Sequence, residues 1–122
     1  MNWNFKEYTE WVTNGYPVDI EVINVDISNN QIESLENIGN LPNLRRLLCS
    51  NCQLKSLKGI EKLLFLRLLN CSDNFIGTLD DVSGLVELRS LSCSNIGILD
   101  LKDLKRLKNM ELLWCKDNNL NS

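Results

Sequence analysis

The stretch that decides the fold of this chain runs from residue 44 to residue 54 and reads Leu-Arg-Arg-Leu-Leu-Cys-Ser-Asn-Cys-Gln-Leu. Apolar residues stand at its first, fourth, sixth and eleventh positions, among others, and this spacing returns with a constant period of 22 residues. Strict internal periodicity of this kind is the sequence signature of a repeat protein. No insertion or deletion interrupts the series of first positions, which are Val22, Leu44, Leu66, Leu88 and Met110.

We describe each unit by offsets, with offset 1 at residues 22, 44, 66, 88 and 110. Offsets 4, 6 and 11 are apolar in every unit, and offsets 14, 17 and 20 are apolar in the four full units. A single unit cannot bury such a row of side chains, whereas stacked units share one continuous core. The sequence therefore predicts that residues 22 apart lie above one another.

The pattern resembles the leucine-rich repeat, written L-x-x-L-x-L-x-x-N/C-x-L, and residues 44–54 match every fixed position if cysteine is accepted at the sixth. The 22-residue period and the later Leu-x-x-Leu/Ile/Val-x-x-Leu segment resemble the internalin-like class of these repeats. The resemblance covers residues 22–120. The Cys-Ser-Asn and Cys-Ser-Asp tripeptides at residues 49–51, 71–73 and 93–95 are also similar to repeat proteins of large DNA viruses and protists.

The resemblance implies an α/β leucine-rich-repeat solenoid, with a parallel β-sheet on the concave side and turns and short helices on the convex side. We divide the chain into an aromatic-rich N-terminal cap, residues 1–21, and repeats at 22–43, 44–65, 66–87 and 88–109, with a partial repeat at 110–122. The aromatic residues of the cap have the spacing of a short amphipathic helix. Because terminal repeats need an atypical cover, we interpret this segment as a helical cap, with a docking helix for another protein as the alternative.

Composition and net charge limit the classes of function that we consider. A chain of 122 residues with 43% hydrophobic and 24% charged residues is one folded domain. A net charge of −3 gives no basic footprint, so we expect neither a nucleic acid nor a membrane as partner. The absence of a signal-like or membrane-length apolar segment leads us to expect an intracellular, cytoplasmic protein.

The cysteines favour a structural interpretation. Four of them share offset 6, where a free cysteine serves as a small buried hydrophobe. Cys49 and Cys52 have the spacing of a zinc knuckle or thioredoxin motif, but a second pair and any histidine are absent. Without histidine the usual general base is missing, so we expect no catalytic, cofactor or metal site and no enzyme. A reducing compartment would preserve such thiols, and a redox role for Cys52 stays as an alternative.

Two further offsets carry polar ladders. Offset 9 holds Asn30, Asn74 and Asn118, and the resemblance implies that these side chains bond backbone groups of adjacent turns. Ile96 interrupts that ladder, so we expect the turn after Cys93 to be the least regular. Offset 7 holds a serine in four consecutive units, which indicates packing and turn chemistry.

Binding must use the offsets that the core leaves free. Offsets 3 and 5 should point out of the concave sheet and bring together two apolar pairs, one of which is Leu48 with Leu68. Leu112 and Trp114 form the other pair, and exposed aliphatic and tryptophan side chains are typical of interfaces, although scattered exposed leucines are also common. Offset 2 carries a row of three arginines, Arg45, Arg67 and Arg89, which suits carboxylates or phosphate, while the bland interpretation is a solvated rim partly neutralised by Glu111 and neighbouring acids.

We therefore predict a protein–protein interaction module that binds an unidentified protein through its concave face. The alternative is a structural or self-assembling protein that forms a homo-oligomer through its C-terminal end, where no cap follows Leu120. That uncovered end also indicates that the chain could be a fragment. The candidate partner-binding residues are Arg45, Arg46, Leu48, Arg67, Leu68, Asn70, Arg89, Leu112 and Trp114.

Overall fold

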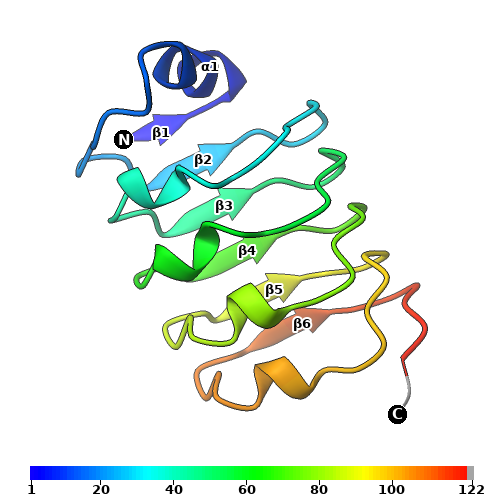
Figure 1. The fold of residues 1–122 in the computed structure, drawn as a ribbon. Helices are drawn as coiled ribbons and strands as arrows, with labels where there is room; N and C mark the ends of the chain where they lie inside the picture. Colours follow the sequence, from blue (N-terminus) through cyan, green and yellow to red (C-terminus); the bar gives the residue numbers. More distant parts are fainter. Residues whose placement is uncertain (121–122) are drawn as a thin grey trace.

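A computed structural model describes residues 1–120 of the chain. Its main element is one six-stranded sheet in which every neighbouring pair is parallel and the strand order follows the sequence (Figure 1). The strands are short; the cap contributes the first, and each repeat contributes one of the others. They are β1 (Asn2–Trp3), β2 (Asn24–Asp26), β3 (Arg46–Leu48), β4 (Leu68–Asn70), β5 (Ser90–Ser92) and β6 (Leu112–Trp114).

The register of the sheet equals the period of the sequence. Val25 pairs with Leu47, Leu69 with Leu91, and every other pair from β2 to β6 likewise joins residues 22 apart. The central residue of each strand points into the molecule, and these residues are at most 1% exposed from β2 to β5. The predicted stacking of the repeats is confirmed.

The return path of each full repeat carries one turn of 3-10 helix, on the side of the molecule that faces the viewer in Figure 1. These turns are η1 (Ile38–Asn40), η2 (Ile60–Lys62), η3 (Asp80–Val82) and η4 (Lys102–Leu104). Adjacent turns pack tightly, and a Cβ at Gly59, which has a φ of 114°, would lie 2.1 Å from the carbonyl oxygen of Leu35. Only glycine fits at that position.

The N-terminal end of the stack is covered by α1 (Phe5–Thr13), which lies over β1 and β2 (Figure 1). Asn4 begins the helix, because its side chain accepts hydrogen bonds from the backbone N–H groups of residues 6 and 7. Tyr8 and Trp11 are buried, and the centroid of the Trp11 ring lies 5.9 Å from the centroid of the Trp3 ring. The helical cap was expected, but the pairing of β1 with β2 was not predicted, since Asn2–Trp3 is too short to show a strand pattern.

The other end of the stack differs. Within residues 1–120, β6 pairs with β5 alone, and its central residue, Leu113, is 38% exposed although it occupies an inward offset. Leu101, Leu104 and Met110 are partly buried, whereas their counterparts in the earlier repeats are buried. Among the described residues, no helix has the length and apolar character needed to cross a membrane.

Candidate functional site

The outward face of the sheet, formed by offsets 3 and 5, is the surface that the sequence selects for binding. Leu48 and Leu68 lie on the adjacent strands β3 and β4 and are half-buried, while Leu112 and Trp114 on β6 are 52% and 45% exposed. Between the two pairs runs β5, whose outward residues are both serines. The face therefore carries two apolar areas separated by a strip of small polar side chains.

The remaining candidates on this face are polar. Arg46 is exposed on β3, and together with Asp26, Asn24 and Trp3 it lines a hollow of about 230 Å³ beside β1. Asn70 is half-buried, and its side-chain oxygen accepts a hydrogen bond from the Ser72 N–H at 3.2 Å. Asn70 thus also serves the turn that follows its strand.

The arginine row at offset 2 is fixed by backbone hydrogen bonds from strand to strand. The Arg67 N–H donates to the Arg45 carbonyl oxygen at 2.8 Å, and the Arg89 N–H donates to that of Arg67 at 2.8 Å. All three side chains are exposed. The structure therefore brings the three arginines to one edge of the sheet face, directly before consecutive strands.

The cysteine column lies inside the solenoid. Cys49, Cys71 and Cys93 have no exposed surface, and Cys115 in the last strand is half-buried. Burial raises the pKa of the Cys49 and Cys71 thiols, and burial together with Cys115 raises the pKa of Cys93 to about 12. These thiols stay protonated at neutral pH, so they pack as apolar groups rather than act as nucleophiles.

Cys52 takes the place of an asparagine in the offset 9 ladder. Its thiol donates to the Ile27 carbonyl oxygen at 3.2 Å and to that of Ser50 at 3.4 Å. Burial raises its pKa above the ordinary value. The side chain is fully covered, which leaves the alternative redox role for Cys52 without an exposed thiol.

The offset 9 ladder works as the resemblance implies, but our expectation about its weak point was wrong. The Asn74 side chain donates to three carbonyl oxygens, and its own oxygen accepts from the N–H groups of Cys52 and Leu54, in the preceding repeat. Isoleucine has no side-chain oxygen, so Ile96 offers no hydrogen-bond acceptor to the turn of the preceding repeat, at residues 72–74. The bends at Asp73 and Asn74 replace the regular turn, while the turn after Cys93 keeps the pattern of the others.

One feature of the turns that follow the strands was missed by the sequence analysis, and another was predicted. Offset 8 holds a residue with positive φ in every repeat, between 51° and 64°, which accounts for its restriction to asparagine and aspartate. The serines of offset 7 were interpreted as turn chemistry, and the structure confirms it, since the hydroxyls of Ser72 and Ser94 accept backbone N–H groups of the next repeat. The missed signal was the unbroken Asn/Asp series at residues 29, 51, 73, 95 and 117.

Comparison with known proteins agrees with this geometry. A family model described as leucine-rich repeats (2 copies) matches residues 20–62 and residues 42–84, which together span more than half of the chain. The chain therefore belongs to the leucine-rich-repeat family, whose solenoids typically mediate protein–protein interaction. No curated protein matches the sequence.

Solved structures share the fold at low sequence identity. Internalin C2 from Listeria monocytogenes has a TM-score of 0.81 at 24% identity, over 84% of this chain and 45% of that one. Internalin F from the same bacterium has a TM-score of 0.78 at 24% identity, over 84% of this chain and 31% of that one. The functional domain of InlJ from L. monocytogenes, which includes a cysteine ladder, has a TM-score of 0.65 at 21% identity, over 80% and 25% respectively. This chain thus spans less than half the length of these proteins.

Proposed function

We propose that the chain is a protein-binding module whose sheet face contacts the partner. The observation that carries the proposal is the exposure of Leu112 and Trp114 on the same face as Leu48 and Leu68. Large apolar side chains that remain exposed together on a folded domain are the usual anchors of interfaces, and tryptophan is enriched among the residues that dominate binding energy. The arginine row at the edge of the face adds donors for partner carboxylates.

Affinity capture from cells that express the protein tests this proposal. The bait carries either the native sequence or the double substitution Leu112→Ser and Trp114→Ala, and bound proteins are quantified by mass spectrometry. The matched control is Phe75→Ser, which removes a 72% exposed aromatic side chain from an outer turn. We expect the double variant to lose a set of proteins that the Phe75→Ser bait retains.

Equal recovery by all three baits would refute a role for the sheet face. Thermal unfolding followed by circular dichroism verifies that each bait is folded. All three positions are exposed, so we expect surface substitutions there to change stability by less than about 0.5 kcal/mol.

A second candidate function is pairing of two copies through β6. The observation in its favour is that Leu113 is 38% exposed at an offset that is otherwise covered, next to exposed Leu112 and Trp114. An edge strand presents unpaired backbone groups, and an antiparallel pair related by a two-fold axis would place Leu113 opposite its own copy. Light scattering should then give a dimer mass that Leu113→Lys reduces to a monomer; a monomer at every concentration would exclude this function.

We also propose a reducing, cytoplasmic location. Its support is that all five thiols are free and that four of them are buried in the solenoid. When the protein is denatured directly from its native cells in the presence of an alkylating reagent, mass spectrometry should find all five cysteines alkylated. A smaller number would contradict the proposed location.

A further inference from the structure

We propose that a second surface, at the edge where the strands start, binds a short partner segment that carries both carboxylates and apolar side chains. This inference rests on the proposed function as a protein-binding module and adds the chemistry of the partner. The surface, here called the strand-start edge, consists of Ile20, Leu64, Phe65 and Val86 together with the arginine row.

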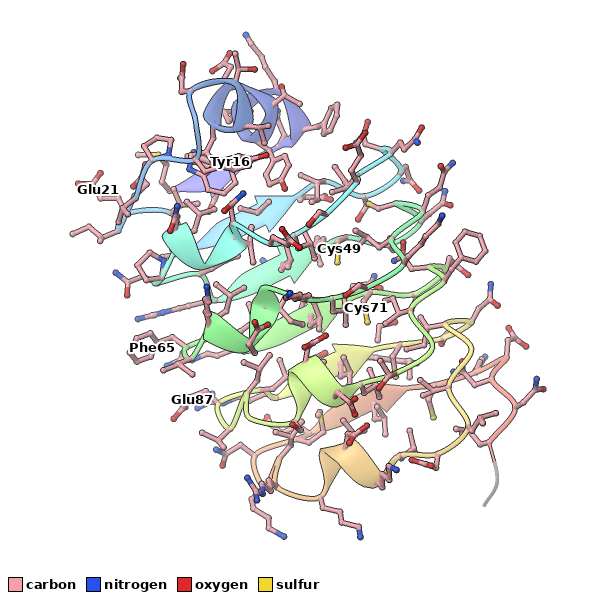
Figure 2. The ribbon with its side chains drawn as sticks, in the orientation of Figure 1. Tyr16, Glu21, Cys49, Phe65, Cys71 and Glu87 are labelled. Carbon is pink, nitrogen blue, oxygen red and sulfur yellow. The ribbon has the colours of Figure 1, made fainter. Side chains whose placement is uncertain are left out.

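The apolar part of this edge is unusually exposed. Ile20, Leu64 and Val86 occupy offset 21, in the loop that leads into a strand, and are 64%, 57% and 49% exposed. Phe65, at offset 22, is 55% exposed and points away from the molecule at the margin of the sheet (Figure 2). Contiguous exposed apolar side chains on a soluble domain mark interaction sites.

Phe65 stands at an offset where two of the other three full repeats carry an asparagine with a structural task, and the third carries Glu87. At the same offset, the Asn43 side chain donates to the Ile20 carbonyl oxygen at 2.9 Å, and the Asn109 side chain donates to that of Val86 at 3.0 Å. These bonds tie each loop to the loop of the preceding repeat. A phenylalanine cannot make such a bond, so its presence in the middle of the stack is unexplained by folding and consistent with a contact to a partner.

The arginine row gives the edge a charge and a spacing. Adjacent strands are about 4.8 Å apart, so Arg45 and Arg89, which directly precede β3 and β5, are separated by roughly 10 Å. A chain in the polyproline II conformation advances about 3.1 Å per residue with three residues per turn, so two carboxylates three residues apart lie on one side and match the outer arginines of the row. Guanidinium groups bind carboxylates through paired hydrogen bonds, which favours Asp or Glu on the partner.

The acidic residues of this edge limit the size and kind of partner. Glu21 and Glu87 flank Phe65 along the same margin (Figure 2), and Glu111 follows the three arginines in the offset 2 row. A flat anionic bilayer would press its phosphates against these carboxylates as well as against the arginines. A short peptide segment can engage the arginines and Phe65 and avoid them, so a protein partner fits better than a membrane.

The experiment uses the 122-residue chain as bait for a phage-displayed library of random twelve-residue peptides. Parallel selections use Phe65→Ser and, as matched control, Phe75→Ser, which removes an exposed aromatic side chain elsewhere. We expect peptides enriched on the native chain to carry two carboxylates about three residues apart and neighbouring apolar residues. Synthetic copies should bind Phe65→Ser and Arg67→Glu about tenfold more weakly, and Phe75→Ser with unchanged affinity.

Several results would overturn the inference: no enriched peptides, enriched peptides without acidic residues, or equal binding to native chain and Phe65→Ser. Leu64→Ser serves as a second variant if Phe65→Ser fails to fold. Co-sedimentation with phosphatidylserine vesicles that depends on Phe65 would assign the edge to membranes instead. Peptide binding that survives Leu112→Ser with Trp114→Ala separates this edge from the sheet face, so either proposal can fail alone.

Discussion

The two ends of the solenoid differ in how much of their inward-pointing side chains is exposed to solvent. At the N-terminal end, α1 and β1 cover the first repeat, and Val25 in β2 is 1% exposed. At the other end, Leu113 occupies the same offset in β6 and is 38% exposed. The offset therefore decides which way a side chain points, while the neighbouring repeat decides whether it is buried and how much it stabilises the fold.

The sharpest way to break this comparison is to truncate the same offset in two places. Leu69→Ala in the middle of the stack removes a fully buried side chain and should cost about 3 kcal/mol of unfolding free energy, because it leaves a cavity between two repeats. Leu113→Ala should cost about 1 kcal/mol, since part of that side chain already faces water. Urea unfolding of both variants measures the difference, and equal losses would contradict it.

The asparagine ladder permits the same comparison with hydrogen bonds. Asn74 and Asn118 each donate to three carbonyl oxygens and accept from the preceding turn, but Asn74 is 3% exposed and Asn118 is half-buried. Asn74→Ala should lose about 2 kcal/mol, because buried polar groups are left unsatisfied, and Asn118→Ala about 1 kcal/mol. Hydrogen exchange of the Cys52 and Leu54 amides should accelerate in the first variant alone. Unchanged protection there would argue against the ladder.

The cap can be tested through one hydrogen bond. The Trp11 indole N–H donates to the Pro17 carbonyl oxygen at 2.7 Å in a partly buried site. Trp11→Phe keeps most of the packing and removes this donor, so we expect a loss of about 1.5 kcal/mol in thermal unfolding. Trp3→Phe, which changes a half-buried indole for which the structure shows no hydrogen bond, is the control and should cost less. A larger loss at Trp3 would indicate that ring packing rather than the bond holds the cap.

Much of the fold could be predicted because individual residues of the sequence show the 22-residue period. Leu47, Leu69 and Leu91 stand 22 apart, and only stacking can bury all three, so strand register followed from the sequence. β1 could not be predicted, because a two-residue strand has no pattern and exists only through its pairing with β2. The effect of Ile96 was placed one turn too late, since the sequence does not show that an offset 9 amide serves the repeat before it.

The binding surface was less predictable than the core. Leu48 and Leu68 were expected to be exposed and are half-buried, because neighbouring side chains on a sheet cover one another. Phe65, Leu64 and Phe75 were not singled out, although all three are more than half exposed. A sequence shows which offsets the core uses, but the exposure of the others depends on loop geometry.

The smallest expected effect concerns Cys93, the thiol of the cysteine column in the fourth repeat. Burial and the nearby Cys115 raise the pKa of Cys93 from 9.0 to about 12. Below pH 9 this thiol is protonated in both the folded and the unfolded chain and has no influence on pH dependence. As the pH rises from about 9 towards 12, the unfolded chain loses this proton while the folded chain retains it, so stability falls.

Urea unfolding at several pH values up to about 9.5 should show a decline in the free energy of unfolding that is smaller in Cys93→Ala by less than about 1 kcal/mol. The comparison uses the change with pH within each protein, so the cavity made by the substitution cancels. An identical decline in both proteins would mean that Cys93 is not shielded by its neighbours, and that even the fourth repeat resembles the open end.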